Sequence, residues 1–158
     1  MNNARLVNIK WVMLLLCLPF IGACSKEDLP AYSDAEITKV GFYHRFYGPD
    51  KDVITGEPIV VEKELTCACS INSENATADV TVTVPAASGK FTTEERDKVV
   101  QGKLWGYLNV STAARVTPLE GAPKLGTPGD WTSVHKYKIM AADGTEKIWT
   151  VKVSAFNK

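Results

Sequence analysis

Two cysteines separated by one residue, Cys67-x-Cys69, have the spacing most relevant to chemistry in this sequence. On a strand both thiols point the same way. A zinc site needs two further ligands, and His44 and His135 are the only imidazoles in the chain. A disulfide between the two cysteines would close a small strained ring. We therefore interpret both thiols as small apolar core side chains, in line with Leu65 and Ile71, and expect no metal.

Other fragments of catalytic or ligand-binding motifs are incomplete. Ser88-Gly89-Lys90 resembles the end of a phosphate-binding loop, but position 84, where the first glycine belongs, is Val84. Asp50-x-Asp52 resembles the start of a calcium loop, yet the later glycine and glutamate do not follow. The Gly-x-Ser-x-Gly, His-Glu-x-x-His and Cys-His-Asn arrangements are absent from the sequence. We expect neither an enzyme nor a cofactor.

Aromatic side chains are better candidates for a binding site. Trp105 and Tyr107 share one face of an expected strand, and Trp131 follows Pro118–Asp130, a segment with three prolines and three glycines. Flat aromatic faces stack on the apolar C–H surfaces of sugar rings. The alternative is packing in the core or beneath a helix, which we favour for Trp105, whereas both interpretations stay open for Trp131. Trp105, Tyr107 and Trp131 are thus the candidate ligand contacts.

The first 23 residues have the pattern of an export signal. Met1–Lys10 carries Arg5 and Lys10 and no acid, and Trp11–Ile21 is almost entirely apolar. At ~1.5 Å per residue this run reaches about 16 Å, roughly half a bilayer core, which is too short to span a membrane. The quartet Ile21-Gly22-Ala23-Cys24 resembles the lipobox of bacterial lipoproteins, which implies acyl chains such as palmitate on Cys24. The alternative is an ordinary secretory signal that is cleaved near Ala23.

Polar residues follow this cysteine at once. Ser25-Lys26-Glu27-Asp28 resembles the export tag that directs Bacteroidota lipoproteins to the outer face of the outer membrane, although any polar tether has similar composition. We expect residues 24–34 to form a tether. The resemblance implies a protein that is anchored in the outer membrane by lipid and exposed at the cell surface.

The charge of the processed chain excludes one class of partner. Removing residues 1–23 leaves 158 − 23 = 135 residues with 16 basic and 18 acidic side chains, a net charge of −2. No field of one sign is present to attract nucleic acid. A domain of ~120 residues can bury a core without disulfides, so we expect one domain over residues 35–158.

The segment Val134–Phe156 predicts a β-hairpin around Asp143-Gly144. A two-residue loop would put the apolar residues of its two strands on opposite faces. A three-residue loop pairs Tyr137 with Trp149 and Ile139 with Lys147, so that the apolar sets coincide. We therefore predict a type I turn followed by a bulge in which Gly144 is left-handed.

Alternating apolar residues predict the remaining strands. These are Ile37–Phe46, with Val40, Phe42, His44 and Phe46 on one face, then Pro58–Ile71, Val80–Val84, Leu104–Val110 and a short Ala114–Thr117. Thr92 and Glu95 have capping-box spacing, which predicts one short helix that ends near Gln101, with Glu94, Arg96 and Asp97 facing solvent. The pattern indicates an all-β sandwich of six to seven strands with one short helix.

The chain resembles a large group of Bacteroidota lipoproteins with immunoglobulin-like domains of unassigned function. The resemblance is carried by Ile37-x-x-Val40-x-Phe42 and by the closing hairpin, from Tyr137 to Gly144 and from Trp149 to Val153, and it covers roughly residues 35–156. It implies an immunoglobulin-like sandwich and a surface module near glycan-capture machinery. We expect a non-enzymatic module that binds a glycan or glycoprotein. The alternative is an assembly protein whose edge strands pair with another surface component.

Overall fold

The protein is a two-sheet β-sandwich. The structure, a computed structural model, describes residues 31–158, so the expected signal peptide and Cys24 lie outside the described residues. The strands are β1 (Ile37–Lys51), β2 (Pro58–Glu64), β3 (Thr66–Asn72), β4 (Thr77–Thr83), β5 (Leu104–Val110), β6 (Arg115–Leu119), β7 (Pro128–Gly129), β8 (His135–Met140) and β9 (Glu146–Asn157). The expected all-β sandwich is confirmed, with nine strands in this range rather than six or seven.

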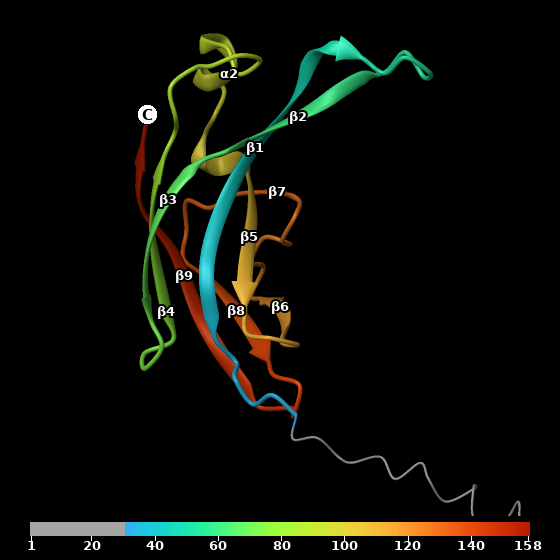
Figure 1. Cartoon of the computed structure of the whole chain (residues 1–158). Helices are drawn as coiled ribbons and strands as arrows, with labels where there is room; N and C mark the ends of the chain where they lie inside the picture. The colour runs from blue at the N-terminus through green and yellow to red at the C-terminus, as the bar shows by residue number, and fades with distance from the viewer. Residues whose placement is uncertain (1–30) are drawn as a thin grey trace, which may run out of the picture. The chain divides into compact units, whose positions relative to one another are not determined.

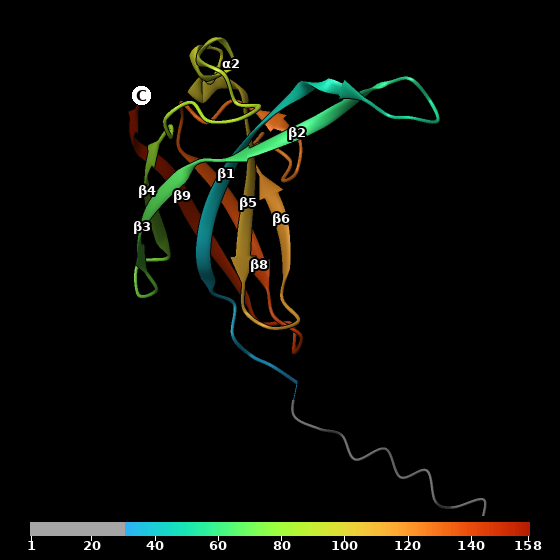
Figure 2. The ribbon, with the colours of Figure 1, turned by 45° about the horizontal axis from the view of Figure 1, so that its top comes forward.

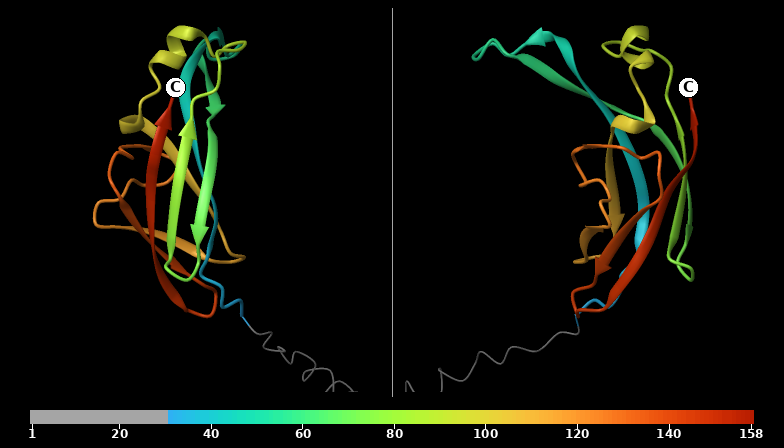
Figure 3. Two further views of the ribbon diagram at one scale, coloured as in Figure 1. Left: turned by 90° about the vertical axis from the view of Figure 1, so that its left-hand side faces the viewer. Right: turned by 180° about the vertical axis from the view of Figure 1, so that it is seen from behind.

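The strands form one sheet in the order β2-β1-β5-β7 and a second in the order β3-β4-β9-β8-β6 (Figure 1). Neighbouring strands are antiparallel except for β4 and β9. In Figure 3 the arrows of β4 and β9 point the same way, with β3 running against them. The parallel pair joins the middle of the chain to its end, a contact that local alternation does not predict.

The closing hairpin has the predicted register. Tyr137 pairs with Trp149 and Ile139 with Lys147. The Gly144 N–H donates to Ala141 O at 3.1 Å, and Gly144 has a φ of 91°. The three-residue loop is therefore confirmed, because only this register places both apolar sets in the core.

Pro58–Ile71 forms two strands rather than one. β2 ends at Glu64 and β3 begins at Thr66, where the chain passes from one sheet to the other. Leu65, at this corner, is 3% exposed, and its N–H donates to Phe42 O at 2.9 Å. One buried residue thus fastens the corner to β1, and the alternation of the segment continues unbroken across it.

β1 is longer than predicted and carries a projecting hairpin. Beyond Tyr43, which pairs with Trp105 of β5, β1 pairs only with β2, as far as Lys51 opposite Pro58. Figures 1 and 2 show this β1–β2 hairpin extending away from the sandwich, at the end opposite to the start of the described chain.

The helical segment is shorter than predicted. α2 (Thr93–Asp97) follows the Thr92 cap, and a 3₁₀ turn, η2 (Gln101–Lys103), leads into β5. Glu94 and Asp97 are exposed, but Arg96 is half-buried because its Nε donates to Pro85 O at 3.0 Å. Among residues 31–158 no helix is long and apolar enough to cross a membrane.

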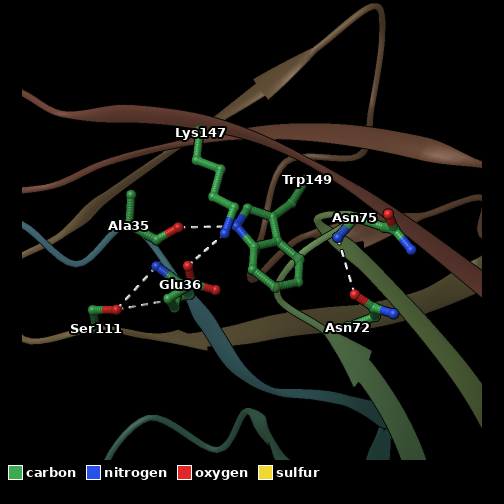
Figure 4. Close-up of polar contacts among 7 residues, drawn as sticks. All are labelled: Ala35, Glu36, Asn72, Asn75, Ser111, Lys147 and Trp149. Atoms are coloured by element: carbon green, nitrogen blue, oxygen red, sulfur yellow. Dashed lines mark hydrogen bonds and ion pairs between the residues drawn. The ribbon is translucent and has the colours of Figure 1, made fainter.

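The core lies between the sheets and is closed at the N-terminal end by polar contacts. Phe42 and Trp131 pack edge to face with ring centroids 4.8 Å apart. Trp149 Nε1 donates to Ala35 O at 2.9 Å, and Lys147 pairs with Glu36 at 2.5 Å (Figure 4). These bonds fix the segment before β1 against β9, so the packed domain begins at Ala35.

Candidate ligand-binding cleft

A cleft of about 670 Å³ lies where the β1–β2 hairpin separates from α2. It exists because β5 begins only at Leu104, so that the β5 side of β1 loses its partner beyond Tyr43. The lining residues come from the hairpin, α2 and the η2–β5 junction: His44, Arg45, Phe46, Tyr47, Val60, Glu95, Lys98, Lys103 and Trp105.

His44 is the buried polar side chain of the cleft. It is 8% exposed and stacks on Phe46 with ring centroids 5.7 Å apart. Its Nε2 lies 3.7 Å from Glu95 Oε2, and neither ring nitrogen has a hydrogen-bond partner among residues 31–158. Burial lowers the pKa of His44, although Glu95 acts against this shift. The imidazole is therefore neutral at pH 7 and offers one donor and one acceptor, as a hydroxyl group requires.

α2 positions the acidic and basic groups of the cleft. Thr92 Oγ1 accepts from the N–H of Glu95 at 3.3 Å, which starts the helix and places Glu95 beside His44. Lys98 follows after one turn and pairs with Glu95 at 2.6 Å. The single turn of α2 therefore determines the distance between the Glu95 carboxylate and the His44 imidazole.

The cleft has a basic rim. Arg45 pairs with Glu62 at 2.5 Å, whereas Lys103 forms no ion pair within the described residues. Three bases and one acid line the cleft. An indole, a neutral imidazole and the ammonium group of Lys103 suit a polar ligand with a flat apolar face. They do not assemble a nucleophile with its base.

The three predicted contact residues separate in the structure. Trp105 lines the cleft. Tyr107 stacks on Tyr43 at 5.1 Å on the same sheet and donates from its hydroxyl to Glu64 at 2.9 Å, outside the cleft lining. Tyr107 also lies against Gly41, where an added Cβ would be 2.2 Å from the ring. Tyr107 is thus held on the sheet by neighbours within the domain.

Trp131 does not offer a contact face, and this prediction is wrong. The side chain is 1% exposed, and its Nε1 donates to Leu104 O at 3.2 Å. Its ring fills the space above Gly106, which leaves no room for a ligand. The indole fastens the Pro118–Asp130 segment to the core, the alternative left open by the sequence.

Cys67 and Cys69 are free thiols in the inward-facing alternation of β3. Both are partly buried against the core, and Cys69 Sγ lies 3.1 Å from Val40 O. Burial raises the pKa of the Cys67 thiol to about 11, which keeps it protonated and unreactive at neutral pH. Across residues 31–158 no group of three or more metal-binding side chains is present.

Few features of the sequence indicated that His44 and Glu95, which are 51 positions apart, would lie side by side. One signal was available: His44 is the polar member of the apolar alternation Val40, Phe42, His44 and Phe46. A polar residue on a core-facing strand side needs a partner or a role. Its partner could not be predicted, because it comes from a separate element.

The fold and cleft define a class of small β-sandwich domains with a ligand-sized depression beside a projecting hairpin. The profile of the DUF5018-related family matches residues 37–152, and the chain belongs to this family. A solved structure from Bacteroides fragilis NCTC 9343, described as a "putative secreted protein", is 64% identical. It covers 82% of this chain and all of its own, with a TM-score of 0.77. No curated protein matches the sequence.

Proposed function

We propose that the protein is a non-enzymatic binding module, attached to the outer membrane through lipid on Cys24, that binds glycan in the cleft. The observation that carries the proposal is the combination of Trp105 with the unpartnered imidazole of His44 in one depression. A sugar ring has apolar C–H faces for an indole and hydroxyl groups for a neutral imidazole.

The surroundings of the cleft support this ligand class. Leaving a buried polar group without a partner costs ~1–3 kcal/mol, and a ligand hydroxyl bonded to one ring nitrogen of His44 removes this cost at that nitrogen. Lys103 and Arg45 at the rim add charged donors for ring oxygens or carboxylates. The secreted description of the Bacteroides fragilis relative agrees with a location outside the cytoplasm.

Edge-strand assembly is the second candidate, and two of the four edge strands, β6 and β7, oppose it. β7 has two residues, and β6 contains Pro118, which lacks an N–H. Short edge strands and edge prolines are features that oppose strand addition.

A glycan array probed with residues 31–158 tests the proposal. Trp105→Ala and His44→Phe should each weaken saccharide binding by at least about tenfold, the loss expected for a central aromatic or hydrogen-bonding contact. His44→Phe keeps the packing against Phe46 and Phe91. Tyr32→Ala removes a ring that is 59% exposed and does not line the cleft, and should bind normally.

Two results would contradict glycan binding in the cleft. One is an array on which the wild-type domain binds no saccharide. The other is binding that survives both cleft substitutions while their melting curves match the wild type.

A further inference from the structure

The tip of the β1–β2 hairpin exposes two aliphatic side chains almost completely. Val53 is 99% exposed and Ile54 is 94% exposed. Five of the nine large apolar side chains that are exposed in residues 31–158 lie on this hairpin: Tyr47, Val53, Ile54, Ile59 and Val60. Single exposed apolar residues are common, but a cluster on a projecting element indicates a contact surface.

The tip is an ordered turn. Asp52 Oδ1 accepts from the N–H groups of Ile54 at 2.9 Å and Thr55 at 2.8 Å. The Gly56 N–H donates to Asp52 O at 2.9 Å, with φ of 72° at Gly56. Val53 and Ile54 are therefore held in one conformation before any partner binds, which lowers the entropy cost of association.

The hairpin is also braced against the body of the domain. Asp50 pairs with Lys90, and Lys63 Nζ donates to Ser88 Oγ at 3.3 Å. Lys63 also lies 5.5 Å from the centre of the Phe91 ring. The hairpin is thus a fixed projection whose direction is set by the Ser88–Phe91 turn.

The tip and the cleft are complementary in charge and in polarity. Residues 50–57 contain three acids and one base: Asp50, Lys51, Asp52 and Glu57. The cleft lining contains three bases and one acid, around the apolar surfaces of Phe46, Val60 and Trp105. An acidic tip with two aliphatic side chains matches a basic cleft with an apolar floor.

We propose that two copies of the domain form a dimer in which the Val53–Ile54 tip of each copy lies in the cleft of the other. Tyr47 in the cleft and Val53 at the tip are six residues apart, which corresponds to at most about 20 Å of extended chain. A two-fold axis at Asp50 then places Val53 beside Tyr47, and Ile54 beside Phe46, of the second copy. The same surface serves both copies, so the assembly closes as a dimer.

Side chains rather than a continuous strand ladder hold this dimer. Pro49 has no N–H to donate, and the β1–β2 register shifts between Tyr47 and Lys51. Both features oppose extended pairing along β1. A contact made by two small apolar tips is weak, with an expected Kd on the order of 100 μM.

Sedimentation equilibrium of residues 31–158, without saccharide, tests the proposal. These residues form a compact unit that contains the whole described core. Wild type should dimerise, and Val53→Lys with Ile54→Lys should raise the Kd by at least about tenfold, because four ammonium groups would enter two basic clefts. Val134→Lys with Ile148→Lys adds the same charges at sites that are 52% and 55% exposed outside the hairpin, and should leave the Kd unchanged.

A second pair of variants tests the cleft side of the contact. Lys103→Glu should weaken the dimer several-fold, whereas Lys152→Glu, an exposed position on β9, should not. The proposal is overturned if wild type stays monomeric at about tenfold above the expected Kd. It is also overturned if the tip variant dimerises as tightly as wild type. Because the tip and a glycan would occupy the same cleft, these measurements contain no saccharide, and the array measures glycan binding separately.

Discussion

At the scale of single residues, a glycine decides the position of Trp131, one of the two largest core side chains. A Cβ on Gly106 would lie 2.2 Å from Cζ2 of Trp131, and the indole is buried against the strand at this point. Trp131 can then contact Phe42, which lies on the neighbouring strand β1 and pairs with Gly106. Because Gly106 on β5 has no side chain, Trp131, which follows the long Pro118–Asp130 connection, can enter the core.

Gly106→Ala should destabilise the domain by about 1–3 kcal/mol, because the added methyl group overpacks a rigid ring. Urea unfolding followed by tryptophan fluorescence measures the change. Gly102→Ala is the matched control, since its Cβ would lie 3.8 Å from Asp130 Oδ1, an ordinary contact. Equal stability of Gly106→Ala and wild type would show that the Trp131 site can relax.

At the scale of elements, the β1–β2 hairpin depends on one carboxylate at its turn. The N–H groups of Thr55 and Ile54 hold the pKa of Asp52 below its usual value of 3.8. The folded pKa is therefore below the unfolded pKa. The ordering effect of Asp52 is complete above pH 3.8 and is lost as the pH falls through the lower, folded value.

Asp52→Ala should loosen the tip without unfolding the domain. We expect backbone order parameters of residues 53–56 to fall below about 0.6 in relaxation experiments, with an unchanged melting temperature. Asp52→Asn keeps the Oδ1 acceptor and should retain most of the order. The interpretation fails if the alanine variant is as rigid at the tip as wild type.

At the scale of the whole molecule, the start of the described chain and the β1–β2 hairpin lie at opposite ends of the domain (Figure 1). The chain enters at Ala31, and the hairpin projects at the opposite end of the sandwich (Figure 1). A chain anchored before Ala31 enters the domain at the end farthest from the cleft and the tip. With the anchor proposed on Cys24, this arrangement would favour contacts with molecules beyond the membrane.

Cys24→Ala should move the protein from the membrane fraction to the soluble fraction in a Gram-negative host. The reason is that the acyl chains proposed for Cys24 provide the stable membrane attachment. Cys17→Ala, within the apolar part of the expected signal, should remain in the membrane fraction. Immunoblots of fractionated cells measure the distribution, and a Cys24→Ala variant that stays with the membrane would exclude this anchor.

Local alternation was sufficient to predict several elements of the fold. The bounds of β5, the inward face of β1 and the register of β8 with β9 all follow from side chains that alternate over a few residues. A shift by one position would expose Tyr137 or Trp149 to water, so a single register is stable. The helix cap at Thr92 could also be predicted from the sequence, because both partners of its hydrogen bond lie within one helical turn.

The sequence by itself determined a two-faced β-domain and the stretches that build it, since burial of one strand face is a local property. Only the tertiary structure decided that β4 pairs in parallel with β9, that Trp131 is enclosed, and that His44 lies beside Glu95. These contacts join segments that are distant in the chain. Their geometry depends on how the sheets pack, because many pairings of similar strands satisfy the same local alternation.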